Sequence, residues 1–452
     1  MDRRRFLAGS AALAATAARA PVAVDDLRTA AREAWIYGLP LVEMAAARGR
    51  MMAAGASVNA FSHQRALAGP LSRTVATPNC DTLYSSAWLD LSSGPVTLVV
   101  PETGARYFSL ALLDFFTNNF AIVGQRRTGG DGGEFTVVGP PGRIGMAGVT
   151  IPRPRLPDLP LLRRPIQAPG RWVWALARTL VEGEADLAAA HTLQDSLYIR
   201  AHAGHAPQPF PGPAAPWNDY FYAVQQLVEE TPPPRAELGF FRRIAPLQLG
   251  MRGGFERARF ADSEVAGIEA GVAEARALVA APPAPGDAVG GWIYPRPDLG
   301  DFGEDYLYRA RVAQAGLGAL PPREALYMRA VAADGRAQFA GGGLYRLSLA
   351  APPPVRGFWS LTLYEVTPQG RLFLTKNSIG RYAVGDRTGL VRRADGGYDI
   401  WIGREDPGGA HTANWLPAPA RGPFALVMRA YLPGPDLLDG RYRLAPVKQL
   451  KG

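Results

Sequence analysis

The chain has 452 residues, of which 47% are hydrophobic and 20% are charged, and it carries a formal net charge of +9. This composition excludes a disordered chain, and the length allows two or three domains with separate cores. The basic residues form scattered pairs such as Arg163-Arg164 and Arg392-Arg393, without a stripe of interleaved aromatic residues. We therefore expect no nucleic-acid partner.

The first residues match an export signal. The run Asp2-Arg3-Arg4-Arg5-Phe6-Leu7 has the twin-arginine pattern, and an apolar stretch follows from residue 7 to 18. That stretch is too short for a membrane span of roughly 20 residues. Small residues at 15–17 and 18–20 offer cleavage sites. The pattern predicts a signal peptide over residues 1–20, export in the folded state by the twin-arginine machinery, and a periplasmic or secreted protein without an integral membrane segment.

Residues 25 to about 50 show helical spacing of apolar residues, with Pro40 expected to kink the helix. Short runs rich in β-branched and aromatic residues then predict antiparallel strands. These runs are 82–91, 96–100, 107–113, 134–138 and 171–180. With a further helix expected at 182–200, we assign residues 25–205 to an N-terminal β-rich domain.

Residues 206–335 are expected to form a helical linker region. Its predicted helices are 217–230, 255–280, 306–315 and 323–333. Strands return at 344–349, 357–365, 371–375 and 424–431, with a hairpin at 389–403 around the turn 394–397. The predicted fold class is α+β and β-rich, with two antiparallel β-sandwich or jelly-roll-like domains, the second at 336–452, linked by a helical segment.

Nucleophile and metal patterns are weak. There is no G-x-S-x-G elbow and no glycine pattern for phosphates. The single cysteine, Cys80, excludes an intrachain disulfide, and the aspartate that follows it disfavours a thiolate. His202 and His205 form a candidate ligand pair for which no third ligand is indicated. We therefore predict no metal and no cofactor.

Polar residues gather at the ends of two predicted strands. The first group is Asn79, Asp81, Thr82 and Tyr84, and the second is Asp114 and Asn118. Two carboxylates within roughly 5–10 Å could share acid and base work, as in glycoside cleavage. The alternative is structural, because Asp and Asn at strand ends usually bond to their own turn backbone.

Six short motifs carry a family resemblance. They are 79–84 (NCDTLY), 101–107 (PETGARY), 113–118 (LDFFTN), 354–364 (PVRGFWSLTLY), 381–388 (RYAVGDRT) and 414–419 (NWLPAP). They resemble, in this order, the bacterial domains of unknown function DUF1254 and DUF1214. The resemblance covers nearly the whole chain after the leader. It implies two β-rich domains joined by helices, often in exported proteins, and it implies no established reaction.

The family commonly has arginine where this chain has Cys80, which argues against an anion-binding role or a nucleophile at that position. The polar positions that match the family are Asn79, Asp81, Thr82, Tyr84, Asp114, Asn118, Asp386, Arg387 and Asn414.

The sequence leaves three hypotheses. The first is an exported enzyme acting on a polar or saccharide-like small molecule or an envelope polymer, with Asp81 and Asp114 as acid and base. Its ligand would be bound by Asn79, Thr82, Tyr84, Asn118, Asp386, Arg387 and Asn414. The second is a non-catalytic carbohydrate- or ligand-binding or assembly protein, with a flat aromatic surface or a homo-oligomer interface. The third is a redox or metal protein that uses this export route to carry a cofactor.

Overall fold

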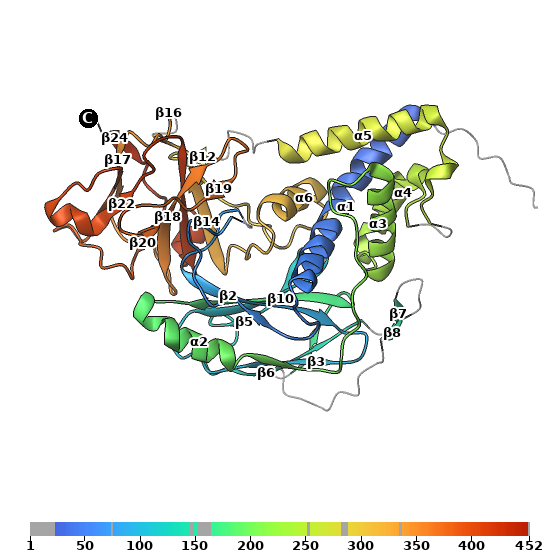
Figure 1. Ribbon diagram of the computed structural model, residues 1–452, viewed down its shortest axis with the longest axis horizontal. Coiled ribbons are helices and arrows are strands. Elements are labelled where there is room, and N and C mark those ends of the chain that lie inside the picture. Colours follow the sequence, from blue (N-terminus) through green and yellow to red (C-terminus); the bar gives the residue numbers. More distant parts are fainter. Residues whose placement is uncertain are drawn as a thin grey trace, which may run out of the picture.

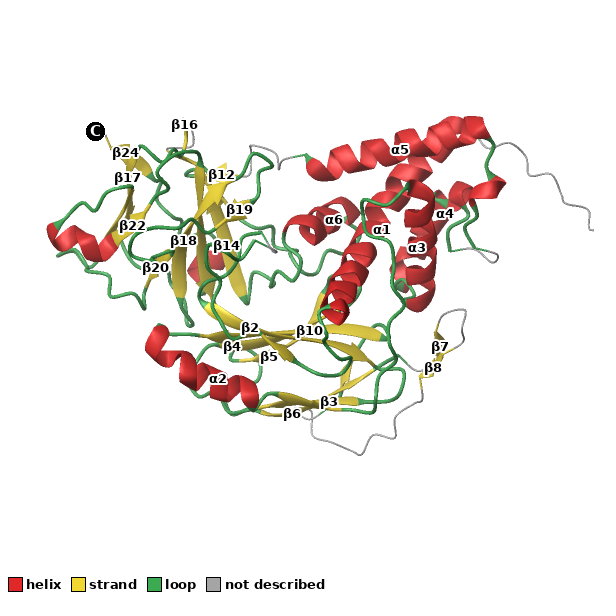
Figure 2. Ribbon diagram, viewed as in Figure 1, coloured by secondary structure: helices red, strands yellow, loops and turns green. Residues whose placement is uncertain are grey.

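The computed structural model describes residues 23–73, 76–140, 142–144, 149–151, 164–250, 254–281, 288–333 and 337–450. The predicted signal peptide and its cleavage sites lie outside the described residues. No helix in the described ranges is both long enough and apolar enough to cross a membrane. Figures 1 and 2 show an N-terminal pair of sheets, a helical layer, and C-terminal sheets beside that layer.

The N-terminal domain contains two sheets that share one core. The larger sheet has the order β1 (Ser62–His63), β2 (Thr82–Asp90), β10 (Trp172–Leu180), β4 (Phe108–Leu113) and β5 (Asn119–Gly124). The smaller has β11 (Tyr198–Arg200), β3 (Val96–Val100), β6 (Gly133–Val138) and β9 (Ile166–Gln167). Leu89, Leu110 and Val173 of the first sheet pack against Leu98 and Val137 of the second. The short hairpin of β7 (Gly142–Ile144) and β8 (Val149–Ile151) stands apart, and α2 spans Leu187–Asp195.

The helical layer is built around α1. Its members are α1 (Val24–Ala53), α3 (Trp217–Glu230), α4 (Leu238–Arg243), α5 (Asp262–Ala280) and α6 (Tyr306–Ala315). Helix α1 continues through Pro40. Two glycines allow its neighbours to approach closely. A Cβ at Gly38 would lie 2.4 Å from Val224 of α3, and one at Gly271 of α5 would lie 2.1 Å from the carbonyl oxygen of Arg28.

The C-terminal domain also has two sheets around a shared core. The first runs β12 (Ala288–Val289), β13 (Trp292–Ile293), β14 (Ala325–Ala330), β23 (Phe424–Tyr431), β18 (Trp359–Val366) and β19 (Leu372–Phe373), with β20 (Ala383–Gly385) also on β18. The second runs β22 (Trp415–Pro417), β21 (Tyr398–Gly403), β17 (Leu344–Leu349) and β24 (Lys448–Leu450). Met328, Leu361 and Met428 of the first sheet pack against Leu347 and Ile400 of the second. Smaller elements are β15 (Ala332–Ala333), β16 (Ala337–Gln338) and α7 (Pro435–Leu438).

The α+β, β-rich fold class is thus confirmed, with mostly antiparallel sheets in both domains. The prediction of a helix at 323–333 was wrong, because this segment contains β14. Its residues are good helix formers, but Leu326, Met328 and Ala330 alternate into the C-terminal core, and tertiary packing overrides propensity. The first strand of the predicted hairpin at 389–403 is also absent, since β21 pairs with β17 and β22. The predicted helix at 182–200 shortens to α2 and is followed by β11.

A buried ion pair ties the helical layer together. The guanidinium of Arg309 on α6 donates to Glu237 at 3.0 Å, and the Tyr37 hydroxyl of α1 donates to the same carboxylate at 2.7 Å. Arg309 is fully buried and lies over the rings of Tyr37, Phe116 and Tyr306. Because the charges are out of water, removal of one partner leaves the other uncompensated.

We expect Glu237→Gln to lower the free energy of unfolding by about 3–5 kcal/mol, because it leaves the Arg309 charge buried without a counterion. The measurement is chemical denaturation followed by circular dichroism. Glu33→Gln is the matched control, since it breaks the exposed Arg243–Glu33 pair and should cost under about 1 kcal/mol. Equal losses in the two variants would contradict a special role for the buried pair.

Candidate active site between the domains

Asp81 joins the two domains just before β2. Its carboxylate accepts hydrogen bonds from Ser360 Oγ at 2.6 Å and from Arg387 Nη2 at 3.3 Å. Ser360 lies on β18 and Arg387 follows β20, so both bonds cross the domain boundary. Arg387 Nε is 3.6 Å from Asp386, which accepts from the backbone N–H of Trp359. The structure therefore brings together three predicted site residues, Asp81, Asp386 and Arg387, but as an interdomain clasp in which every carboxylate has partners.

Asn79 makes a second bridge across the boundary. Its Nδ2 donates to the hydroxyl of Tyr431 at 2.8 Å and to Thr82 Oγ1 at 3.1 Å. Its Oδ1 accepts from the backbone N–H of Asp81 at 2.8 Å. Asn79 is thus fixed in orientation, and it positions a tyrosine of the C-terminal domain over the end of β2.

Asp114 and Asn118 lie elsewhere. On β10, Leu180 pairs with Thr82 and Trp174 pairs with Leu113. Asp81 and Asp114 lie one residue beyond these positions at opposite ends, level with Val181 and Val173, which places them roughly 26 Å apart along the sheet. The predicted acid–base pair is therefore not assembled. Both oxygens of Asp114 instead accept from Asn118, one from its backbone N–H at 2.9 Å and one from its side chain at 3.1 Å.

Asn414 has a structural role in place of the predicted ligand-binding one, and the surroundings of Cys80 disfavour a thiolate, as expected from the sequence. The Asn414 amide bonds to both backbone groups of Val391 and to the carbonyl of Asp399, so it braces a loop of the C-terminal domain. Cys80 is half-buried beside Thr362, and burial raises the pKa of its thiol to about 12. A thiol that stays protonated is a poor nucleophile.

The outer face of the larger N-terminal sheet meets the outer face of the C-terminal sheet through a set of tyrosines and arginines. We call this set the tyrosine–arginine cluster. Its members are Tyr84, Tyr107 and Arg178 from the N-terminal domain and Tyr327, Arg429 and Tyr431 from the C-terminal domain. The hydroxyl groups of all four tyrosines act electrostatically on Arg178.

The strand register explains how the cluster forms. Arg178 on β10 stands opposite Tyr84 on β2, and Tyr327 on β14 stands opposite Arg429 on β23. Side chains directly opposite one another on antiparallel strands share a face. Arg178 lies over the Tyr84 ring, 5.2 Å from its centroid. Across the boundary, the rings of Tyr107 and Tyr431 have centroids 4.9 Å apart.

The environment separates the acidities of the tyrosines. Burial alone raises the pKa of Tyr84, but the charge of Arg178, the amide of Asn79 and the charge of Arg429 outweigh it, and the pKa falls below its usual value. Burial raises the pKa values of Tyr107, Tyr327 and Tyr431. Groups whose pKa values are pushed apart at one site are the usual sign of acid–base assignments.

Tyr84 and Tyr327 keep part of their accessible surface, whereas Tyr107, Arg178 and Tyr431 are buried. Each of these two tyrosines is therefore in contact with solvent over part of its surface, and the tyrosine with the lowered pKa is one of them.

Glu324 contacts the cluster through Tyr107. This fully buried carboxylate accepts from the Tyr107 hydroxyl at 3.2 Å and from Arg126 Nε at 2.6 Å. Burial raises its pKa, while Arg126 and Tyr107 oppose the shift. Because both donors come from the N-terminal domain, Glu324 is another contact between the domains.

Asp90, Ser92 and His205 meet near β2, but Asp90 Oδ2 and Ser92 Oγ both contact His205 Nδ1, at 3.1 and 3.2 Å. A catalytic triad needs the aspartate and the serine on opposite ring nitrogens. Asp90 also pairs with Arg171 at 2.8 Å, which indicates a structural role.

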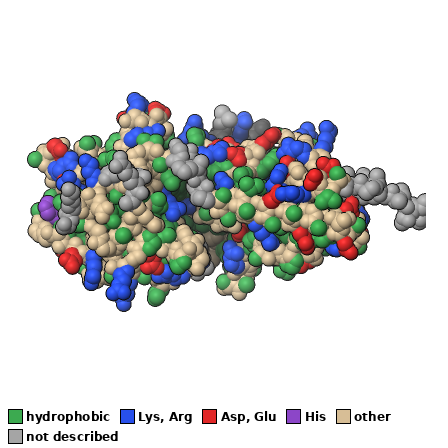
Figure 3. Space-filling model, turned by 90° about the horizontal axis from the view of Figure 1, so that it is seen from above, with side chains coloured by type: hydrophobic (Ala, Val, Ile, Leu, Met, Phe, Trp, Pro, Cys, Tyr) green, Lys and Arg blue, Asp and Glu red, His purple; other side chains and the backbone are tan. Residues whose placement is uncertain are grey.

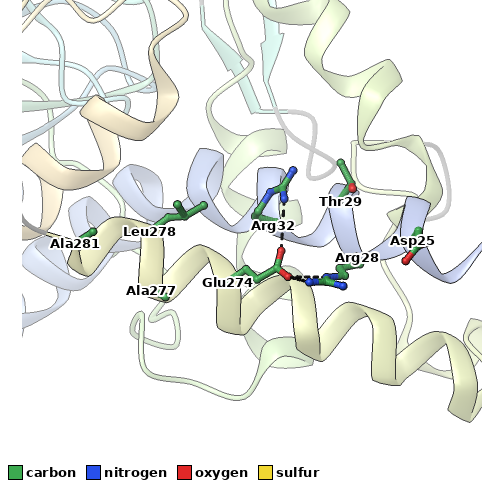
Figure 4. Close-up of a pocket in the computed structure, with 8 residues that line it drawn as sticks. All are labelled: Asp25, Arg28, Thr29, Arg32, Glu274, Ala277, Leu278 and Ala281. Atoms are coloured by element: carbon green, nitrogen blue, oxygen red, sulfur yellow. Dashed lines mark hydrogen bonds and ion pairs between the residues drawn. The ribbon is translucent and has the colours of Figure 1, made fainter. Parts of the chain in front are cut away.

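A groove between α1 and α5 is shown in Figure 4. Its lining residues are Asp25, Arg28, Thr29, Arg32, Glu274, Ala277, Leu278 and Ala281. Glu274, in the middle of the groove, is already bonded to Arg28 and Arg32. On the face seen in Figure 3, basic and acidic side chains alternate over the helical half of the molecule. No group of three or more potential metal ligands was found in the part of the chain that the structure describes.

Sequence reasoning found Tyr84 and Asn79 but missed Tyr107, Arg178, Tyr327, Arg429 and Tyr431. Tyr327 was hidden by the incorrect helix at 323–333. Arg178 and Arg429 each interrupt an otherwise apolar strand, and both strands are buried almost throughout. A charged residue within an apolar strand could have identified both arginines as candidates from the sequence. Buried arginines are rare unless they have a specific partner.

Two family models match separate parts of the chain. The model of a protein family of unknown function, DUF1254, matches residues 58–201, and that of another, DUF1214, matches residues 324–435. No curated protein is significantly similar to the chain. The crystal structure of the VPA0106 protein from Vibrio parahaemolyticus is similar, with 22% identity, a TM-score of 0.68, and coverage of 94% of this chain and 100% of that one. A putative uncharacterized protein from Burkholderia cenocepacia is 12% identical with a TM-score of 0.45, covering 94% and 95%. At 22% identity, the similarity to the Vibrio parahaemolyticus protein concerns the fold alone.

Asp114 should affect stability through its titration. Burial raises its pKa to about 6 from the ordinary 3.8, so the folded state holds this proton more tightly than the unfolded chain does. The stabilisation is complete below the unfolded pKa and is lost as the pH rises through about 6. Asp114→Asn removes this titration. We expect the stability of the variant relative to wild type to improve by roughly 2 kcal/mol between pH 4 and pH 7.

The measurement is the unfolding free energy of both proteins across that pH range. A constant offset caused by the amide does not matter, because the readout is the difference in pH dependence. Parallel curves for the two proteins would show that Asp114 titrates normally.

Proposed function

We propose, since the chain belongs to the family that joins a DUF1254 domain to a DUF1214 domain and both domains build the tyrosine–arginine cluster, that their interface is the active site of an exported enzyme. The substrate is a small polar molecule, and the chemistry is general acid–base catalysis. The observation that carries the proposal is the placement of Tyr84 against Arg178, where accessible space reaches the tyrosine. The lowered pKa of Tyr84 among tyrosines with raised pKa values supports it.

In this mechanism Tyr84 takes the role that the sequence had suggested for the carboxylates. As a phenolate stabilised by Arg178, it accepts a proton from the substrate, and as a phenol it returns the proton to the product. Asn79 holds its neighbour Tyr431 in place through the 2.8 Å hydrogen bond. The carboxylate of Asp81 is bonded to Ser360 and Arg387, which supports a positioning role for it rather than proton transfer.

A small molecule is favoured over an envelope polymer by burial. The cluster residues Arg178, Arg429, Tyr107 and Tyr431 are at most 4% exposed. A polymer chain would need the two domains to separate, and the Asp81 clasp and Glu324 contacts oppose that. A small ligand needs to reach only the exposed parts of Tyr84 and Tyr327.

The acidity of Tyr84 can be measured without knowing the substrate. We expect the absorbance of tyrosinate in the wild-type protein to rise with an early phase at a pH below that of ordinary tyrosine, because Arg178 stabilises the phenolate. Tyr84→Phe should remove this phase. Tyr222→Phe is the control, since Tyr222 is 52% exposed and lies outside the cluster. An early phase that survives in Tyr84→Phe would exclude Tyr84 as the acid–base group.

Once a substrate is found by screening, Tyr84→Phe should lower kcat by about 10²–10⁴-fold with a small change in KM, as expected for loss of a general acid–base group. A change confined to KM would indicate a binding role only.

Export is the other part of the proposal, and the leader supports it. Replacement of Arg3 and Arg4 by lysine keeps the charge but removes the arginine pair, so the precursor should accumulate in the cytoplasm. Arg5→Lys, at the spacer position, is the control and should be exported. Cell fractionation with immunodetection measures both. Normal export of the double variant would contradict the twin-arginine route.

A further inference from the structure

The cluster contains two arginines that have no acidic ion-pair partner. Four arginines are buried in the part of the chain that the structure describes: Arg48, Arg178, Arg309 and Arg429. Arg309 pairs with Glu237 at 3.0 Å, and Arg48 lies 3.5 Å from Glu230. Among the described residues, no carboxylate lies within 4.0 Å of Arg178 or Arg429. Arg178 and Arg429, the two buried arginines without a carboxylate partner, therefore both belong to the tyrosine–arginine cluster.

The neutral groups around the two arginines fix their positions. Arg178 Nη2 donates to the carbonyl of Gly318 at 2.6 Å. Arg429 donates to Thr362 Oγ1 at 3.0 Å and to the carbonyl of Thr77 at 3.2 Å. These bonds hold the guanidinium groups in place through neutral acceptors, with no carboxylate in direct contact.

Arg178 also has an unused donor. Its Nη1 is buried and has no hydrogen-bond partner among the residues described. A buried donor without a partner is costly, and a buried charge without a counterion costs more. Asp81 acts on Arg429 and Glu324 acts on Arg178 at longer range, but each carboxylate makes its ion pair with another arginine, Arg387 and Arg126 respectively.

We propose that the tyrosine–arginine cluster binds an organic anion, whose oxyanion group accepts a hydrogen bond from Arg178 Nη1 and whose apolar part lies against Tyr84 and Tyr327. This inference rests on the proposed active site and specifies its ligand class. The oxyanion group is a carboxylate or a phosphate, since arginine binds both with charge-assisted hydrogen bonds. The aromatic faces around the site suit a flat or ring-shaped body.

Calorimetric titration of the full-length mature protein tests the inference with simple probes. Benzoate carries a carboxylate, phenyl phosphate a phosphate, and benzamide has a similar shape without charge. We expect at least one of the two anions to bind at millimolar or lower concentration and benzamide to bind at least about tenfold more weakly. The anion that binds more tightly identifies the oxyanion group.

Arg178→Gln should weaken binding of that anion by about 10- to 100-fold, as expected for loss of a hydrogen bond to a charged group. Arg106→Gln is the control, because Arg106 pairs with Asp186 outside the cluster, and it should leave the affinity unchanged. If Arg178→Gln does not fold, the comparison of benzoate with benzamide on the wild-type protein still decides the question.

Equal affinities for benzoate and benzamide, no binding of either anion, or a folded Arg178→Gln variant with unchanged affinity would each overturn the inference. The tyrosinate titration separates this failure from failure of the proposed function. An early Tyr84 phase without anion binding keeps the acid–base proposal and removes the anion. Anion binding without an early phase keeps the ligand class and removes the acid–base role.

Discussion

The burial of both faces of the larger N-terminal sheet is the constraint on which the rest of the structure depends. The inner face of β2, β4 and β10 packs on the smaller sheet, as it would in any two-layer β domain. The outer face is also covered, by α1 at one end and by the C-terminal sheet at the other. An antiparallel sheet normally leaves one face to solvent, so the polar side chains on this outer face are removed from water and need partners.

The two ends of that outer face satisfy the requirement differently. Under α1 the face is apolar, with Trp88, Trp172 and Leu176 in the core of the helical layer. Under the C-terminal sheet it carries Tyr84 and Arg178, which meet hydroxyl groups and a second arginine instead of carboxylates. Burial of the outer face therefore stabilises the fold at the end under α1. At the end under the C-terminal sheet, it produces a polar, positively charged interior. Functional chemistry is expected at the second end, because low polarity strengthens every charge interaction there.

The sequence predicted elements well where periodicity was strong and local. The strands 96–100, 344–349 and 424–431 and the helices 217–230 and 306–315 agree with the structure to the residue. It failed at 323–333, where residues with high helix propensity form the strand β14 because the C-terminal core selects every second side chain. Local preference could not reveal this, since the partner strand β23 lies about a hundred residues later.

The site was predicted in part for a similar reason. Motifs near β2 identified Asn79, Asp81, Thr82 and Tyr84, all of which lie at the domain boundary. The expected partner Asp114 does not, because its distance from Asp81 depends on the register of β10 between β2 and β4. Arg178 and Arg429 come from strands without any motif, and only the contact between the two sheets places them together. Sequence spacing carries no information about that contact.

The contribution of Glu324 has a consequence for how this protein can be divided. Its carboxylate serves Tyr107 and Arg126 of the other domain, while its backbone carbonyl accepts from Leu432 within its own. Each domain therefore contributes only some of the tyrosines and arginines of the cluster. Neither domain contains the whole site. If recombination separated the two domains, each product would expose a surface that is now buried, and neither would contain a complete cluster. We therefore expect the two domains to be inherited together in one chain.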